Sequence, residues 1–307
     1  MLPTPDAYRS RVHKLLRRWD PRGLFYSKAQ CATAVARLEA PHDISTAAEL
    51  AHAQKVCDAA VHPVLNQPIP SAFRVCSLLP VTYGLSLAMI STAKLATPTL
   101  FYHWLYQTHS AATRYCNYAD TSRPLSVERM TAAYAASTAA AWGIALGSAS
   151  IVHRIPRLAM LGMAVPHGAV ACAGAISTVM NSEVELREGV AVHGADGREV
   201  GVSRAAAREV VKNAVLLHGV LVPACALLLP VITSHSLIVP RLVRAKNARM
   251  IWPASAAVVG VCCCVITPLA AALVSPTVSL PPHAPLEPEL EARRKPGETL
   301  VSSRMLY

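Results

Sequence analysis

The sequence predicts an all-α fold: a polytopic membrane bundle of about five transmembrane helices, preceded by amphipathic helices. The stretch 78–100 is mostly apolar, carries one charge (Lys94) and is long enough to cross a hydrocarbon core of about 30 Å as a helix. Four more such stretches follow it. Of the 307 residues, 53% are hydrophobic and only 15% are charged, whereas a soluble domain carries about 25% charged residues.

The first 77 residues are expected to form a polar region of surface helices. Apolar residues recur at helical spacing within 8–19, opposite a basic face, which suits a helix lying on a membrane surface. A third helix is expected to start with Ser45 as its N-cap and to stop at His62-Pro63. The three helices are placed at 8–19, 27–38 and 45–61.

The transmembrane bundle is expected over 78–274. Long apolar runs place its five spans at about 78–100, 131–152, 158–180, 214–239 and 251–274. The stretch 102–130 between the first two spans is interpreted as a loop with aromatic residues at interfacial depth. Gly143 and Gly147 form a G-x-x-x-G in the second span, which either lets two helices approach closely or occurs by chance in an Ala/Gly-rich helix.

Two segments outside the spans have compositions of their own. The polar loop after the third span contains 193–201, whose glycines predict a hairpin or turn, and Ser203 suits the cap of the helix that follows. The tail, 275–307, is Pro-rich and is expected to be disordered at least in part.

Basic residues in short turns predict the orientation. The turn 240–250 contains four Lys or Arg and the turn 153–157 contains two. In a five-span layout both turns lie on the side of the N-terminal region, which is itself basic. The N-terminus is therefore expected on the positive-inside face and the C-terminus on the opposite face.

Composition and motifs exclude several function classes. The net charge of +11 is explained by Lys and Arg that face lipid headgroups, because no basic run is interleaved with aromatics as in nucleic-acid binders. The nine cysteines form no C-x-x-C pair, and the run 262–264 suits packing in an apolar helix, so neither a disulfide framework nor a metal site is expected. No G-x-S-x-G, H-E-x-x-H or phosphate-binding loop is present, so no enzyme, catalytic residue or cofactor is expected.

Several short blocks resemble, in order and spacing, those of the sideroflexin family. The first is 20–27 (DPRGLFYS), which is similar to the family's D-P-R-x-L-F-x-S box. His62-Pro63, Phe73-Arg74 and Pro80 are similar to the family's H-P…F-R…P block. The stretch 104–107 is similar to its W-x-x-Q and 115–117 to its Y-x-N. The family's loop after the third span is matched by Glu185-Leu186, Gly189, Gly197 and Gly201. The resemblance covers roughly residues 8–275.

The resemblance implies a multi-pass carrier in the mitochondrial inner membrane, with a small neutral amino acid such as serine as its solute. In that membrane the positive-inside face predicted for the N-terminus is the matrix side. This sequence departs from the family at 64–68 (VLNQP for D-T-G-E-K), at 114–118 (RYCNY for N-Y-x-N-R) and at 178–182, which lacks the Pro and Arg of I-P-x-x-R. These departures leave open an alternative: a scaffold or assembly factor of the same fold that has lost transport.

A zwitterionic solute needs partners for both its carboxylate and its ammonium group, and polar side chains among the helices supply them. Two candidates follow from the spans themselves. Lys94 is a charge within a span, where it either lines a cavity or extends to the headgroups. His167 follows Pro166 in the third span, where it either binds solute or is a hydrogen-bonded structural histidine.

The other candidates follow from the family resemblance. Gln107 and Asn117 either line an entrance or hold a re-entrant segment by hydrogen bonds. Glu185 matches a family position after the third span, and His62 either contributes to the site or joins the surface helices to the first span. The predicted solute-binding residues are thus Lys94, Gln107, Asn117, His167, Glu185 and His62.

Overall fold

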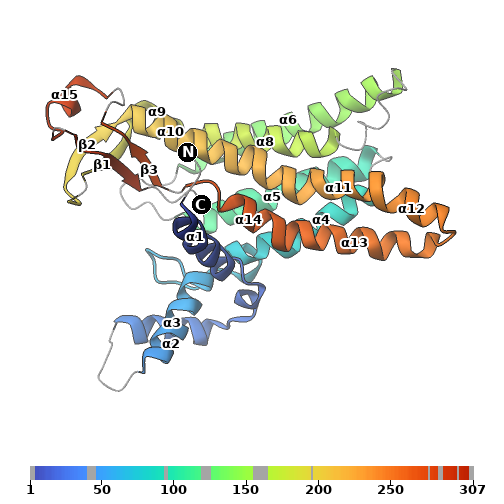
Figure 1. Cartoon of the computed structure of the whole chain (residues 1–307), viewed down its shortest axis with the longest axis horizontal. Helices are drawn as coiled ribbons and strands as arrows, with labels where there is room; N and C mark the ends of the chain where they lie inside the picture. The colour runs from blue at the N-terminus through green and yellow to red at the C-terminus, as the bar shows by residue number, and fades with distance from the viewer. Residues whose placement is uncertain are drawn as a thin grey trace.

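The chain is mostly helical and carries one small sheet at one end (Figure 1). The computed structural model describes residues 4–39, 46–92, 96–118, 126–154, 165–194, 196–275, 277–282, 286–295 and 297–303. The all-α prediction is therefore correct for most of the chain and misses the sheet.

The elements fall into four groups along the chain. The N-terminal region contains α1 (Pro5–Arg18), η1 (Pro21–Phe25), α2 (Lys28–Glu39), α3 (Ala47–Ala60), η2 (Ser71–Phe73) and η3 (Val75–Ser77). The first part of the bundle contains α4 (Leu78–Thr92), α5 (Ala96–Cys116), α6 (Val127–Arg154), α8 (Val165–Asn181) and the short α9 (Glu183–Glu188). After the strands β1 (Val190–His193) and β2 (Glu199–Ser203) come α10 (Arg204–Val215), η5 (Leu216–Leu221), η6 (Ala224–Leu228), α11 (Leu229–Thr233), η7 (Ser234–Ile238), α12 (Val239–Arg244), η8 (Ala248–Met250), α13 (Ile251–Val261), η9 (Cys262–Ile266) and α14 (Thr267–Ala271). The C-terminal segment contains β3 (Thr277–Leu280), α15 (Pro288–Glu291) and β4 (Leu300–Ser303).

The helices α1, α2 and α3 occupy the three N-terminal stretches expected to be helical. The start of α3 is set by a capping box: the Thr46 hydroxyl accepts from the Glu49 amide at 3.3 Å, and the Glu49 carboxylate accepts from the Thr46 amide at 3.0 Å. The cap is thus Thr46 rather than the predicted Ser45, which lies outside the described residues.

A buried arginine joins η1 to the segment that leads into α4. Arg74 is 3% exposed, and its guanidinium donates to the carbonyl oxygens of Gly23 at 2.6 Å, Tyr26 at 3.0 Å and Ile69 at 2.9 Å. Hydrogen bonds from a charged donor are among the strongest in proteins. The two blocks that contain Gly23 and Arg74 therefore meet in space as one structural joint.

Asp20 extends this joint to α3. Its carboxylate accepts from the backbone amide of Arg22 at 3.0 Å, which caps η1, and lies 3.1 Å from the Lys55 ammonium. The hydrogen bond from the Arg22 side chain lowers the pKa of Asp20 to about 2. The carboxylate is therefore ionised throughout the physiological pH range.

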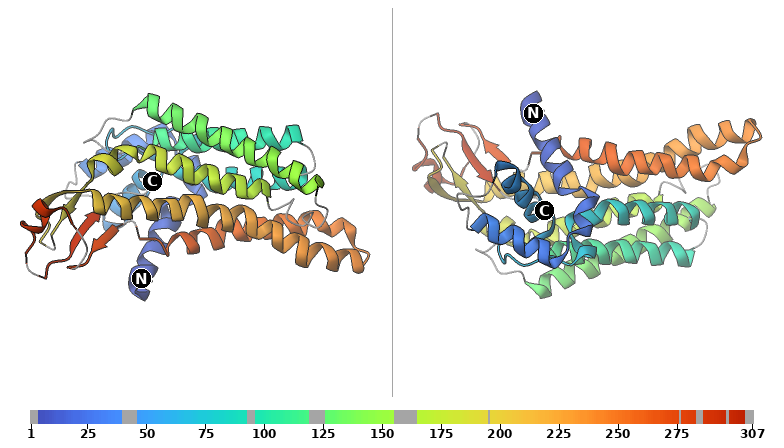
Figure 2. Two further views of the ribbon diagram at one scale, coloured as in Figure 1. Left: turned by 90° about the horizontal axis from the view of Figure 1, so that it is seen from above. Right: turned by 90° about the horizontal axis from the view of Figure 1, so that it is seen from below.

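Six helical segments within the described residues run alternately away from and towards the N-terminal region (Figures 1 and 2). They are α4, α5, α6, α8, the run from α10 to α12 and the run from α13 to α14. Two hydrogen bonds attach the ends of α5 and α14 to the N-terminal region. The Asn117 amide donates to the Phe73 carbonyl at 2.8 Å, and the Tyr8 hydroxyl donates to the Leu269 carbonyl at 3.0 Å. The turn between α12 and α13 lies at the far end.

The interpretation of 102–130 as a loop is wrong, because α5 covers Ala96–Cys116. This helix mixes apolar residues with His103, Gln107 and Arg114, so hydropathy does not mark it. The added helix reverses the chain once more. The C-terminal segment consequently lies at the same end as the N-terminal region, and the expectation that the termini lie on opposite faces is also wrong (Figure 1).

Length and hydropathy do not confirm five spans. Of the described helices, the stretches Arg204–Ala226 and Ile251–Ala271 are long and apolar enough to cross a membrane, and Val75–Met89 and Gly168–Asn181 are shorter apolar helices. Large apolar side chains point outward along these helices: Val261 is 53% exposed and Val265 50%. An apolar outer surface of this kind suits lipid rather than water.

Two bundle helices approach each other closely at glycines outside the predicted G-x-x-x-G. A Cβ atom on Gly174 of α8 would lie 2.8 Å from the His218 carbonyl oxygen, and one on Gly219 would lie 2.8 Å from Cβ of Ala175. Nothing in the described chain lies within 4 Å of a Cβ built on Gly143 or Gly147. The contact between α8 and η5 therefore depends on small residues, and the predicted G-x-x-x-G makes no such contact here.

The sheet joins two distant parts of the chain. Its strand order is β2-β1-β4-β3, all pairs antiparallel. The β1–β2 pair confirms the hairpin predicted at 193–201, and the Ser203 hydroxyl accepts from the Ala206 amide at 3.1 Å, which confirms the predicted cap of α10. The tail expected to be disordered instead supplies β3, α15 and β4.

Apolar side chains explain why the tail folds back. Leu290 and Leu300 are at most 5% exposed and share one core cluster with Leu15 and Trp19 of the N-terminal region and with the inner face of α10. Burial of each such side chain contributes roughly 1.5–3 kcal/mol. The proline content of the tail, taken alone, predicts disorder. The apolar partners that order the tail lie far away in the sequence, so a local pattern does not reveal them.

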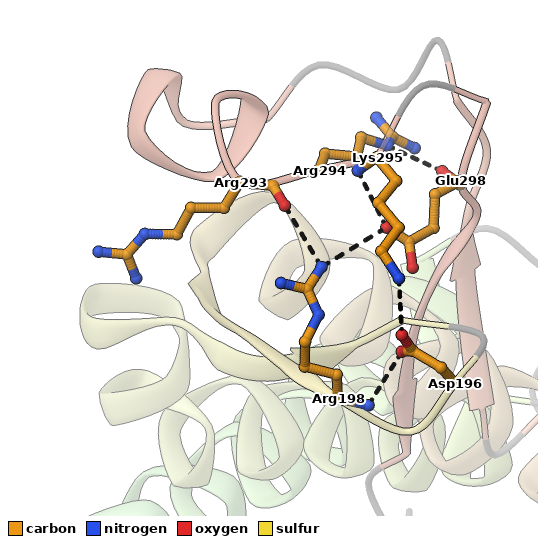
Figure 3. A network of polar contacts seen from close by, with 6 residues as sticks. All are labelled: Asp196, Arg198, Arg293, Arg294, Lys295 and Glu298. Atoms are coloured by element: carbon orange, nitrogen blue, oxygen red, sulfur yellow. Dashed lines mark hydrogen bonds and ion pairs between the residues drawn. The ribbon is translucent and has the colours of Figure 1, made fainter.

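A polar network closes the tail over the β1–β2 hairpin (Figure 3). The Lys295 ammonium donates to Asp196 at 2.9 Å, and the Lys295 amide donates to the Glu298 carboxylate at 3.0 Å. The Arg198 amide donates to Asp196 at 3.1 Å, and its guanidinium donates to the Arg293 carbonyl at 3.4 Å. These contacts hold the tail and the hairpin as one unit.

Because both termini lie at the same end of the bundle, we expect them on the same side of the membrane. Epitope tags at the N- and C-termini should be cut together, or protected together, when protease is added to sealed vesicles that contain the protein in one orientation. A tag inserted after Lys246 in the far turn should show the opposite behaviour. Cleavage of one terminal tag with protection of the other would contradict the arrangement.

The Arg74 joint predicts a loss of stability on conservative substitution. Arg74→Lys keeps the charge but cannot donate in three fixed directions at once. At least one buried carbonyl loses its partner, which costs about 2 kcal/mol and should lower the apparent Tm in detergent by roughly 4 °C or more. The exposed Arg9→Lys is the control and should leave Tm unchanged; equal behaviour of the two variants would refute the joint.

Candidate functional site

A small polar cavity lies between α5, α6 and α8. Its lining comes from Gln107, Ser110, Ala111 and Arg114 on α5, from Met130, Tyr134 and Ser137 on α6, and from Ser177 and Asn181 on α8. All of these except Ala111 and Met130 are polar. The cavity volume is about 10 Å³, which is space for about one water molecule.

Helical spacing brings the α5 residues to one face. Gln107, Ser110, Ala111 and Arg114 stand at i, i+3, i+4 and i+7, which places them one above another. Two hydrogen bonds fix this face against α6: the Trp142 indole donates to the Leu100 carbonyl at 3.0 Å, and the hydroxyls of Thr108 and Tyr134 lie 2.9 Å apart. The position of the cavity is therefore set by direct bonds between α5 and α6.

The Gln107 amide keeps hydrogen-bonding capacity that the described residues do not use. Gln107 is 5% exposed, and its Nε2 has no hydrogen-bond partner among the described residues. Ser137 and Asn181, by contrast, donate to the carbonyls of Tyr134 at 3.0 Å and Ser177 at 2.7 Å. Since a buried N–H without a partner costs roughly 1–3 kcal/mol, Gln107 is suited to donate to a solute oxygen.

Arg114 sets the charge of the cavity. It is the one ionised residue among those that line it, and no carboxylate is among them. A guanidinium can bind a carboxylate through two parallel hydrogen bonds. The arrangement thus offers a cation and an amide donor to an anionic group, and hydroxyl and amide oxygens to a donor group.

Of the predicted solute-binding residues, the structure brings Gln107 to this cavity. Asn117 lies past the end of α5, where its amide donates to the carbonyls of Phe73 at 2.8 Å and Thr113 at 2.7 Å. Glu185 is buried at 5% exposure in α9, beyond the end of α8. Neither residue lines the cavity.

His62 holds the joint between the N-terminal region and α5. Its Nδ1 accepts from the amides of Val64 and Leu65, each at 3.2 Å, so Nε2 carries the proton and donates to the Tyr118 carbonyl at 2.7 Å. Both ring nitrogens are therefore used within the protein, which agrees with the structural interpretation of His62.

The remaining two candidates stay predictions. Lys94 lies outside the described residues. His167 lies in the first turn of α8, and its side chain is likewise outside the described part.

Sequence reasoning missed most of the lining. Arg114 is missed because 102–130 is interpreted as a loop, where residues have no common face. Tyr134 and Asn181 lie outside that stretch, and only the structure brings them to the cavity. The available signal was the spacing of Gln107, Ser110 and Arg114 in the printed sequence, which is helical and polar on one side.

Comparisons with known proteins agree with the motifs. The family model described as Sideroflexins matches residues 5–306. Sideroflexin-5 of Rattus norvegicus is 30% identical over 297 residues, which cover 94% of this chain and 85% of the relative. Sideroflexin-1 of Ovis aries is 28% identical over 299 residues, 94% of this chain and 88% of the relative. Sideroflexin fsf1 of Schizosaccharomyces pombe is 32% identical over 215 residues, 66% of this chain and 65% of the relative. No solved structure matches the chain.

Proposed function

This chain belongs to the sideroflexin family, and we propose that it transports small neutral amino acids, serine-like ones above all, across the mitochondrial inner membrane. The observation that carries the proposal is the polar cavity among α5, α6 and α8, with the buried Gln107 amide directed at it. Polar groups enclosed within a membrane bundle are costly, and where they persist they mark the route of a solute.

The lining suits a zwitterion. The solute carboxylate accepts from the Gln107 amide and from the guanidinium of Arg114. The ammonium donates to hydroxyl oxygens such as those of Ser110 and Ser177, which supply dipoles without a compensating negative charge. The lining contains no carboxylate, so a solute with a second ammonium finds no charged partner there, which disfavours basic amino acids.

Transport requires the helices around the cavity to move. A volume of about 10 Å³ holds about one water, so a solute of several heavy atoms enters only after α5, α6 and α8 separate. Carriers alternate between openings on the two faces of the membrane through such movements. The cavity lies towards the end of α5 that meets the N-terminal region, so we propose that solute enters or leaves at that end.

The orientation remains a proposal: the N-terminal region faces the matrix. The turn 240–250 does not support it, because that turn lies at the opposite end of the bundle from the N-terminus (Figure 1). The general basic character of the N-terminal region is the remaining support. The protease experiment on tagged vesicles determines which end faces the matrix.

The tight packing around the cavity favours a second candidate, a membrane scaffold or assembly factor of the same fold that has lost transport. Such a protein would co-purify with a stable protein partner and would take up no solute. Transport and partner capture are therefore the measurements that separate the two functions.

Reconstituted protein should take up labelled serine. Gln107→Leu removes the buried amide at nearly constant volume and should weaken solute binding by about tenfold or more, because one hydrogen bond to a charged group is lost. The exposed Gln54→Leu on α3 is the control and should retain uptake. If folded wild-type protein takes up no small neutral amino acid above empty vesicles, the transport proposal is wrong.

A further inference from the structure

A second buried polar side chain lies one turn from Gln107 on α5. His103 is completely buried, and neither of its ring nitrogens has a hydrogen-bond partner among the described residues. A neutral imidazole always carries one N–H donor and one acceptor. Leaving both unpaired in a protein interior is unfavourable, so both ring nitrogens are available to a ligand.

Thr138 on α6 lies at the same level. The Leu100–Trp142 and Thr108–Tyr134 hydrogen bonds join α5 to α6 on either side of His103 and Thr138. Thr138 is 8% exposed, and its hydroxyl also lacks a partner among the described residues.

The unpaired hydroxyl of Thr138, like that of Thr113 on α5, departs from the usual behaviour of a helical threonine. Such hydroxyls ordinarily donate to the carbonyl four residues earlier, as that of Thr131 does to Val127 at 2.8 Å and that of Thr178 does to Gly174 at 2.7 Å. Two unpaired hydrogen-bonding side chains thus occur in one short section of the α5–α6 pair.

His103 continues the polar face that lines the cavity. His103, Gln107, Ser110 and Arg114 stand at i, i+4, i+7 and i+11, on one stripe of α5. His103 lies about 6 Å further along the helix axis than Gln107. The fully buried Ala141 of α6 lies less than one turn beyond Thr138 and is a small side chain.

We infer that His103 and Thr138 form the inner end of the solute site and bind an uncharged hydroxyl group of the solute. The inference rests on the proposed function. A hydroxyl group donates one hydrogen bond and accepts others, which matches an imidazole and a threonine hydroxyl. The spacing of about 6 Å along the axis fits a small amino acid whose carboxylate lies at Gln107 and whose side chain points towards His103.

This inner end predicts preference for a hydroxylated solute over its methyl analogue. Sites built to hydrogen-bond a hydroxyl reject an analogue that lacks it, because the buried polar groups then remain unpaired. Wild-type protein in liposomes should therefore take up serine at least tenfold more efficiently than alanine, compared as kcat/KM.

The test is the serine-to-alanine ratio of the variants. His103→Phe and the near-isosteric Thr138→Val should each lower it at least fivefold while alanine uptake persists, and His103→Gln, which restores a donor and an acceptor, should recover most of it. The exposed Thr131→Val on α6 is the matched control and should keep the wild-type ratio.

The outcomes separate this inference from the proposed function. If wild-type protein takes up neither amino acid, the proposed function fails. If uptake is present but His103→Phe and Thr138→Val both keep the wild-type ratio, transport stands and the inner hydroxyl site is refuted. A monodisperse elution profile in detergent is required of each variant, and Thr138→Val supplies the result if His103→Phe does not fold.

Discussion

The structure depends on the requirement that backbone polar groups inside a membrane be paired within their own helices. Once α4 to α14 satisfy that requirement, the remaining hydrogen-bonding groups at depth are side chains, and their positions decide what the bundle can bind. Most of the buried hydroxyls are paired locally: Ser86, for example, donates to the Thr82 carbonyl at 2.6 Å. The exceptions on the long helices of the described bundle are His103, Gln107 and Thr113 of α5, Thr138 of α6 and Ser234 of η7. Because three of the five belong to α5, this helix is the main candidate for solute binding.

The two ends of the bundle have different constructions. At one end the N-terminal helices, the sheet and the ends of α5, α8 and α14 form a single folded layer, in which Arg74, His62 and Asn117 bind backbone carbonyls and Leu15 and Trp19 share a core with the C-terminal segment. At the other end, in the part that the structure describes, α12 and α13 are joined by a short turn (Figure 2). The folded layer holds the outer ends of the helices that line the cavity, so movements that admit a solute must occur relative to this layer.

Sequence reasoning succeeded where the signal is local. The N-terminal helices, the hairpin between β1 and β2 and the Ser203 cap all follow from residues a few positions apart. It failed where the partner is distant. The tail joins β1 through pairing across about a hundred residues, and the close approach of Gly174 to η5 depends on a helix that cannot be identified from the spacing of glycines alone. Hydropathy does not mark α5, because polar residues occupy its inner face, and these same residues are the candidates for solute binding. Gln107 entered through a family motif, whereas His103, one turn away, has significance only once its burial is known.

The most direct test of the central claim is a crystal structure of the detergent-purified protein with serine. The account predicts one serine molecule between α5 and α6, with its carboxylate within hydrogen-bond distance of Gln107 Nε2 and its hydroxyl within hydrogen-bond distance of His103 or Thr138. A serine-saturated structure in which His103 and Gln107 are paired with protein groups, with no solute between these helices, would contradict it.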